Sequence, residues 1–165
     1  MVVRLGAAIC VAVTMVVVYS SVSRARLVDH QLNLHVVAAG PVIRGIASTY
    51  NPYRPGYRSG GRETASGERY DAAAWTAAIQ TNLREIFGGV RYGKEYRPVF
   101  ALVMSVDKQV IVKINDVGPL EPGRVMDFNE QTMRYFDPAL QRGLIPISVT
   151  PLLGDDWLPG PIENS

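Results

Sequence analysis

A chain of 165 residues with 47% hydrophobic content has room for one globular domain and is too apolar for a disordered segment. The formal net charge of +2 arises within the first 40 residues, so the remainder lacks the basic charge that attracts nucleic acid or anionic lipid. Cys10, His30 and His35 also fall in that region, which excludes a disulfide framework, a cysteine nucleophile and a thiolate metal site from the domain and leaves mainly Asp and Glu for acid–base chemistry.

The N-terminus has the pattern of an export signal. Residues 1–4 are short and positive, residues 5–19 are apolar, and small serines follow. We therefore expect export to the periplasm or cell envelope, either with cleavage of residues 1–23 or with residues 5–19 kept as a membrane anchor near the lower length limit of a span. Cys10 lies inside the apolar run, which favours a buried apolar residue over a site of lipid attachment. We expect no other contact with the membrane.

A β-rich domain over residues 41–153 follows a linker at 24–40. Residues 43–50 (IRGIASTY) alternate between apolar and polar, as in a half-buried strand. Residues 51–71 are rich in Gly, Pro, Ser and Arg, and long loops of this kind in compact domains are usually functional. Residues 72–84 predict a short helical turn or an irregular crossing.

A β-hairpin is predicted next. Residues 99–106 (VFALVMSV) and 109–115 (QVIVKIN) are β-rich runs separated by a short polar break at Asp107 and Lys108. We expect residues 116–119 (DVGP) to end the second strand.

The last third of the domain predicts two more extended segments and one helix. Residues 124–127 form a brief extended piece, and residues 145–152 form a final strand. Between them, Asn129 is a suitable N-cap for a short helix over residues 130–136, with Met133 and Phe136 on its buried face. Residues 154–165 form a tail over the surface, in which Trp157 is expected to cover part of the core. Short strands with one short helix favour a small mainly-β barrel.

Three polar segments carry most of the chemistry-bearing side chains. They are GIASTY with ETASGERYD, which hold Tyr50, Thr64, Ser66, Glu68, Tyr70 and Asp71; VKINDVGP, which holds Asn115 and Asp116; and GRVMDFN, which holds Arg124, Asp127 and Asn129. Together they resemble the rare lipoprotein A family, whose double-psi β-barrel is shared with expansins and some lytic transglycosylases. The family pattern runs G-x-A-S-x-Y, T-A-x-G-E-x-Y/F-D, T-A-A-H, N-D-R-G-P and G-R-x-x-D-L-S, and the chain follows it in order across residues 45–150. The resemblance implies a mainly-β fold, a small six-stranded double-psi β-barrel with one or two short helices.

The resemblance also implies endolytic cleavage of the peptidoglycan glycan strand between N-acetylmuramic acid and N-acetylglucosamine, which yields a 1,6-anhydro sugar without a cofactor or metal. Asp116 then protonates the leaving glycosidic oxygen, Glu68 matches the second functional acid of the family, and Asp127 matches the acid of related barrel transglycosylases. Such a step needs a carboxylic acid kept protonated by burial or by a second carboxylate. Positioned proton transfer of this kind contributes roughly 10²–10⁴-fold to the rate.

Sugar binding is expected from hydroxyl, amide and guanidinium groups and from an aromatic face. The candidates are Tyr50, Thr64, Ser66, Tyr70, Asn115 and Arg124, with Trp75 or Tyr53 for stacking. We expect a monomer whose partner is the glycan strand. Plainer roles compete with these: Asp116 suits a turn, Asp127 suits an ion pair with Arg124, and Thr64 and Ser66 suit loop shaping. Lys113 is expected on a solvated face.

The chain departs from the family pattern at three positions. The histidine of T-A-A-H is Ile79, the arginine of N-D-R-G-P is Val117, and the serine of D-L-S is Asn129. Without the histidine and arginine, the barrel either cuts through carboxylates alone or, as expansin-like barrels do, grips glycan without cutting it. A third alternative is an envelope component that docks protein partners.

Overall fold

The computed structural model describes residues 40–55, 61–90 and 93–162. The expected export signal and the three residues Cys10, His30 and His35 lie outside the described residues. No helix in the ranges that the model describes combines the length and apolar character needed to cross a membrane.

Most of the regular structure is β-strand, as the alternating segments predict. The strands are β1 (Ile43–Thr49), β2 (Thr76–Gln80), β3 (Val99–Ser105), β4 (Lys108–Gly118), β5 (Arg124–Phe128), β6 (Ile145–Leu152) and β7 (Gly160–Pro161). The described residues add one α-helix, α3 (Glu130–Phe136), and the 3₁₀ turns η1 (Thr81–Leu83) and η2 (Gly93–Glu95).

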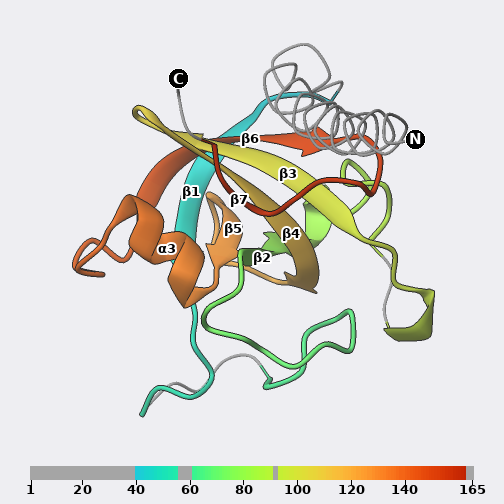
Figure 1. The fold of residues 1–165 in the computed structure, drawn as a ribbon, viewed down its shortest axis with the longest axis horizontal. Coiled ribbons are helices and arrows are strands. Elements are labelled where there is room, and N and C mark those ends of the chain that lie inside the picture. The colour runs from blue at the N-terminus through green and yellow to red at the C-terminus, as the bar shows by residue number, and fades with distance from the viewer. Residues whose placement is uncertain (1–39, 56–60, 91–92, 163–165) are drawn as a thin grey trace, which may run out of the picture. The chain divides into compact units, whose positions relative to one another are not determined.

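Six of the strands close into a barrel in the order β2-β5-β1-β6-β3-β4, and pairing between β2 and β4 joins the two ends (Figure 1). The β1–β5 and β2–β4 pairs are parallel, whereas the other neighbours in the barrel run antiparallel. The short β7 lies against β4 outside this ring. The predicted small double-psi β-barrel is therefore confirmed.

Apolar side chains from every strand of the barrel fill its interior. Fully buried members include Ala47, Ile79, Val103, Val112, Met126 and Val149. Neighbouring side chains of a strand point to opposite faces, so the residues next to these positions project outward from the barrel. Because of this alternation, the polar side chains next to the core positions lie on the outer face of the barrel.

The helix α3 packs against this core, and its predicted cap and buried face are confirmed. The Asn129 side chain accepts a hydrogen bond from the Thr132 amide at 3.0 Å, as expected of an N-cap residue. Met133 is fully buried, and the ring of Phe136 stacks on that of Phe128 with 5.8 Å between centroids.

Two predictions for the middle of the chain are confirmed only in part. Residues 72–84 contain the expected short helical turn, η1, but the strand β2 precedes it, because β2 is held on both sides by β4 and β5. Residues 116–119 end the hairpin strand as expected, although β4 continues alongside β2 through Gly118 before it ends. The register of the β2–β4 pair skips one residue, so Asn115 is the extra residue of a β-bulge. Bulges bend a strand and re-aim its side chains, and they are frequent beside active sites.

The C-terminal tail is more ordered than expected, because β7 pairs with Val110 and Ile111 of β4. Trp157 is 5% exposed and donates a hydrogen bond from Nε1 to the Leu153 carbonyl at 2.7 Å. Its predicted role as a cover over the core fits this burial.

Candidate functional site

Two carboxyl groups lie on the outer face of the barrel on either side of β2. Ala78 of β2 pairs with Asp116 of β4 on one side and with Asp127 of β5 on the other. Asp127 in turn pairs with Ser48 of β1. Side chains at paired positions project from the same face of a sheet, and two strand spacings place the Cα atoms of the two acids about 10 Å apart. The strand register thus places two of the three predicted acids, Asp116 and Asp127, opposite the same residue of β2.

The Asp116 carboxyl is held in one orientation. Its Oδ1 accepts hydrogen bonds from the backbone amides of Ala65 and Val117, both at 2.9 Å. Its Oδ2 accepts from the Tyr50 hydroxyl at a longer 3.4 Å. Burial raises the pKa of Asp116, and these hydrogen bonds only partly oppose the rise. Because Oδ1 already receives two donors, a proton on this carboxyl belongs on Oδ2.

The second carboxyl, Asp127, is even more strongly disposed to hold a proton. Burial raises the pKa of Asp127 to about 6; the nearby Ser48 hydroxyl and the charge of Arg124 oppose the rise, and the charge of Asp116 adds to it. Within the part of the chain that the model describes, Asp127 Oδ1 and Ser48 Oγ are buried without a hydrogen-bond partner. Arg124 begins β5 opposite Ile46 and acts on Asp127 through its charge.

Tyr50 lies close to both carboxyls and keeps its proton. Burial, followed by the charges of Asp116, Tyr70 and Asp127, raises the pKa of Tyr50 well above its ordinary value. The Tyr70 hydroxyl donates to the Tyr50 carbonyl at 2.8 Å and accepts from the Glu130 amide at 3.2 Å. Tyr70 therefore ties the end of β1 to the start of α3 and fixes Tyr50 as a neutral donor beside the two acids.

Thr64 and Ser66 shape the loop that leads to the third predicted acid. The amide and hydroxyl of Thr64 both donate to the Glu68 carbonyl, at 2.8 and 3.0 Å. The hydroxyls of Thr64 and Ser66 lie 2.9 Å apart, and the Ser66 amide donates to the Asn115 carbonyl at 3.0 Å. Both side chains are buried, so their hydroxyls bind the loop together and dock it on the β4 bulge.

Glu68 is an ionised group rather than a proton donor. Burial alone would raise its pKa, but hydrogen bonds from Lys113 and Asn115 outweigh burial and lower the pKa. Lys113 Nζ forms an ion pair with Glu68 Oε1, and Asn115 Nδ2 donates to Oε2 at 3.1 Å. The expectation that Lys113 is solvated is wrong, since its side chain is 24% exposed and engaged by this pair. No local sequence signal joins two residues that lie this far apart in the chain.

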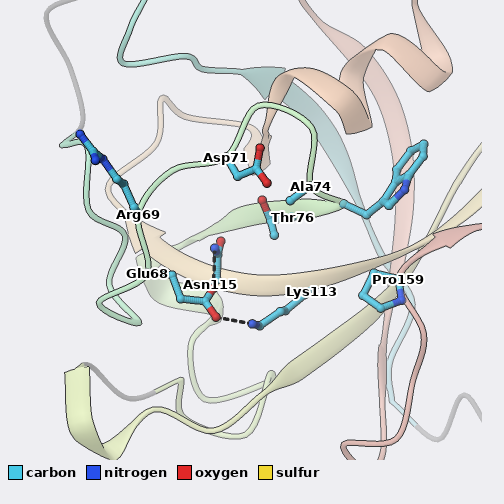
Figure 2. A pocket seen from close by; sticks show the side chains of 9 residues that line it. Glu68, Arg69, Asp71, Ala74, Thr76, Lys113, Asn115 and Pro159 are labelled. Carbon is cyan, nitrogen blue, oxygen red and sulfur yellow. Dashed lines mark hydrogen bonds and ion pairs between the residues drawn. The ribbon is translucent and has the colours of Figure 1, made fainter.

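A cleft of about 320 Å³ opens beside this ion pair (Figure 2). It is lined by Glu68, Arg69, Asp71, Ala74, Trp75, Thr76, Lys113, Asn115 and Pro159. Its volume is near the lower end of the range for small-ligand sites. Trp75, which packs edge-on against Tyr135 at 5.9 Å, gives it an aromatic side chain, while carboxylate, amide and hydroxyl groups supply hydrogen-bonding partners. Asn115 belongs to the lining and directly precedes Asp116 in β4, so the cleft and the carboxyl row adjoin at the bulge.

These groups provide acid–base and electrostatic chemistry. In the described ranges, no three His, Cys, Asp or Glu side chains come together in a way that would hold a metal ion. The side chains present are two carboxyls with raised pKa values and one fixed carboxylate, all near a polar cleft with an aromatic residue.

The family model described as lytic transglycolase matches residues 43–149, which includes nearly the whole barrel. The endolytic peptidoglycan transglycosylase RlpA of Campylobacter jejuni is 30% identical over 112 residues, which cover 68% of this chain and 34% of that protein. A probable endolytic peptidoglycan transglycosylase RlpA of Synechocystis is 36% identical over 90 residues, covering 54% of this chain and 23% of the relative. The chain thus spans about a third of the first relative and about a quarter of the second.

Among solved structures, a Streptomyces papain inhibitor matches this chain with a TM-score of 0.50 and 17% sequence identity. The match covers 68% of this chain and 96% of the inhibitor, and it shows a similar fold.

Proposed function

Since the chain belongs to the lytic transglycolase family, whose model matches residues 43–149, we propose that its barrel cleaves the glycan strand of peptidoglycan as a lytic transglycosylase. The observation that carries this proposal is the row of two protonatable carboxyls, Asp116 and Asp127, beside a cleft that contains a fixed carboxylate. The named activity of the relatives supports the same reaction class.

In the proposed reaction Asp116 transfers the proton. Its Oδ2 proton passes to the glycosidic oxygen as the bond from that oxygen to the anomeric carbon breaks. The hydroxymethyl oxygen of the same sugar then attacks the anomeric carbon, and the proton it loses returns to Asp116. The carboxylic acid is regenerated, no water is consumed, and the product is a 1,6-anhydro sugar. The backbone amides on Oδ1 keep the reactive oxygen oriented throughout.

Glu68 and Asp127 have complementary roles in this scheme. Glycosidic cleavage develops positive charge on the sugar ring, and the ionised Glu68 in the cleft stabilises that charge. Asp127 adds a second carboxyl near Tyr50, and its charge when ionised raises the pKa of the Tyr50 hydroxyl, which therefore stays a neutral donor beside Asp116. Trp75 offers the sugar an apolar ring within the same cleft.

Digestion of peptidoglycan sacculi followed by mass spectrometry tests this proposal. Soluble 1,6-anhydro-muropeptides are expected from the native protein and are expected to disappear with Asp116→Asn. The matched control is Asp156→Asn, because Asp156 is an exposed carboxylate in the C-terminal segment. Anhydro products that persist with Asp116→Asn would exclude Asp116 as the acid.

A second function, glycan binding without cleavage, is favoured by one observation. Ile79 and Val117, which stand where the family pattern has histidine and arginine, are direct partners in the β2–β4 register, and Ile79 is fully buried. The barrel therefore has an apolar contact in place of two polar groups. Co-sedimentation of the native protein with sacculi, without any anhydro product, would support this second function.

A further inference from the structure

An exposed tyrosine contacts two arginines, one of which lines the cleft. Tyr53 is 44% exposed, and the guanidinium carbon of Arg62 lies 5.2 Å from the centre of its ring. Arg69 donates a hydrogen bond from Nε to the Tyr53 hydroxyl at 3.2 Å. Arg69 also lines the cleft, and Figure 2 shows its side chain extending away from Glu68 and Lys113. We refer to these three residues as the Tyr53 cluster.

Hydrogen bonds and ring packing fix the Tyr53 cluster on its loop. The Tyr53 ring packs edge-on against Tyr70 at 6.0 Å, and the Tyr53 amide donates to Asn51 Oδ1 at 2.9 Å. A β-bridge between Glu63 and Arg69, with a hydrogen bond from the Tyr70 amide to the Arg62 carbonyl at 2.8 Å, sets the two arginines beside each other. Guanidinium groups held in this way lose less conformational entropy when they bind a ligand.

Two other arginines among the described residues form ion pairs with a carboxylate. Arg54 and Arg134 both pair with Glu130, at 3.3 and 2.7 Å. By contrast, neither Arg62 nor Arg69 forms an ion pair with any residue that the model describes.

Two acidic side chains of the same loop, Glu63 and Asp71, form no ion pair with the Tyr53 cluster among the described residues. Glu63, the bridge partner of Arg69, is exposed and unpaired among the described residues. Asp71 of the cleft accepts a hydrogen bond from the Ala73 amide at 2.9 Å. Two exposed guanidinium groups, one of them in the cleft lining, suit a carboxylate, which arginine binds through paired hydrogen bonds.

On the basis of the proposed function, we propose that the Tyr53 cluster binds a carboxylate carried by the glycan strand next to the sugar in the cleft. The domain then prefers strands that bear ionised carboxylates over uncharged polymers of N-acetylated sugars. The lactyl ether of the muramic sugar and the stem peptide both present this chemistry, and the experiment separates them.

Co-sedimentation with three insoluble polymers during brief incubation tests the inference. Intact sacculi carry stem-peptide carboxylates, sacculi stripped of stems by an amidase carry free lactyl carboxylates, and chitin carries neither. The test variant is the double substitution Arg62→Gln with Arg69→Gln, and the control is Arg44→Gln, because Arg44 is an exposed arginine at the start of β1. Thermal unfolding of each variant verifies that the fold is retained.

The double substitution is expected to weaken binding to carboxylate-bearing polymer roughly tenfold, as expected when charge-assisted hydrogen bonds are lost. It should also flatten the salt dependence of binding and leave chitin binding unchanged. A loss confined to intact sacculi assigns the stem peptide, and a loss confined to stripped sacculi assigns the lactyl group. Equal losses on all three polymers, or no loss on any, would overturn the inference.

The binding assay and the cleavage assay can refute the carboxylate site and the lyase separately. Carboxylate preference that depends on the two arginines, in a protein that releases no anhydro products, would keep the Tyr53 cluster as a binding site and refute the lyase. Anhydro products released equally by the native protein and the double variant, with unchanged binding, would keep the lyase and refute the carboxylate site.

Discussion

Replacing Asn129 tests how the helix α3 and the wall of the cleft are joined. Asn129 is 0% exposed, and its Oδ1 caps α3 by accepting from the Thr132 amide. Its Nδ2 donates to the carbonyls of Asp71 and Ala74, which precede β2 and line the cleft. One side chain therefore fixes the helix and the loop together, at a position where the family pattern has serine.

The two substitutions Asn129→Ala and Asn129→Ser separate these contributions. Loss of an N-cap costs about 1 kcal/mol, and each buried hydrogen bond that is lost costs about 1 kcal/mol or somewhat more. When Nδ2 of Asn129 is removed, the Asp71 carbonyl still accepts a hydrogen bond from the Ala74 amide at 3.3 Å. The Ala74 carbonyl is then the acceptor that loses its side-chain hydrogen bond. We expect a loss of about 2–3 kcal/mol for alanine. Serine retains the cap, so its loss should be about 1–2 kcal/mol.

Urea unfolding measures both losses, with Asn82→Ser as the control because Asn82 is an exposed asparagine in η1. The free energy of unfolding should fall in the order native, serine, alanine, with no change for the control. Both Asn129 variants should also bind sugar more weakly, since Asp71 and Ala74 belong to the cleft lining. Equal losses for serine and alanine would refute a separate capping term, and a serine variant as stable as the native protein would refute a contribution from Nδ2.

Three further predictions concern strain, protonation and burial. Val106 is 97% exposed with a φ of 55° in the turn between β3 and β4; Val106→Gly should raise the unfolding free energy by about 1 kcal/mol in urea titration, because glycine adopts this conformation without strain. The pKa of Asp127 is about 6 in the folded chain and about 4 when unfolded. The native state therefore binds an extra proton at this site, and the contribution of Asp127 to stability should fall as pH rises from about 4 to about 6, by at most roughly 3 kcal/mol. Asp127→Asn should remove this contribution, so the change in unfolding free energy between the two ends of that pH range should shift upward relative to the native protein, and an unchanged pH dependence would refute the assignment. Ile79→His should lower the midpoint of thermal unfolding, and by more at pH 5 than at pH 7, because a buried imidazole is costly and its cation more so.

Local patterns were sufficient to predict the elements whose signals lie within a few residues. Alternation marks β1, and β-branched runs mark β3, β4 and β6. Asn129 predicts the start of its helix, because asparagine is a favoured N-cap residue. The strand β2 has no such signal, because TAAIQ contains two alanines and little β-propensity. Its conformation is imposed by β4 and β5, which lie far away in the sequence.

The same distinction applies to the site. The sequence motifs identified Asp116, Asp127 and Glu68 as candidates. Only the strand register shows that Asp116 and Asp127 flank Ala78, and only the folded structure shows that Lys113 keeps Glu68 ionised. No spacing in the sequence predicts these relations, since they depend on how separate strands pair. Whether each acid acts in catalysis stays a prediction for the variants described above.

The register also changes the meaning of the two departures from the family pattern. Read along the sequence, Ile79 and Val117 are separate losses of an imidazole and a guanidinium. In the barrel they are paired across β2 and β4, so both departures fall at one place in the sheet. Ile79 lies in the core, whereas its neighbour Ala78 projects outward between Asp116 and Asp127. The two departures therefore leave the carboxyl row in register, because they occur at the next position along each strand. A reaction run by carboxylates needs that row and the cleft beside it, and neither depends on a histidine at position 79.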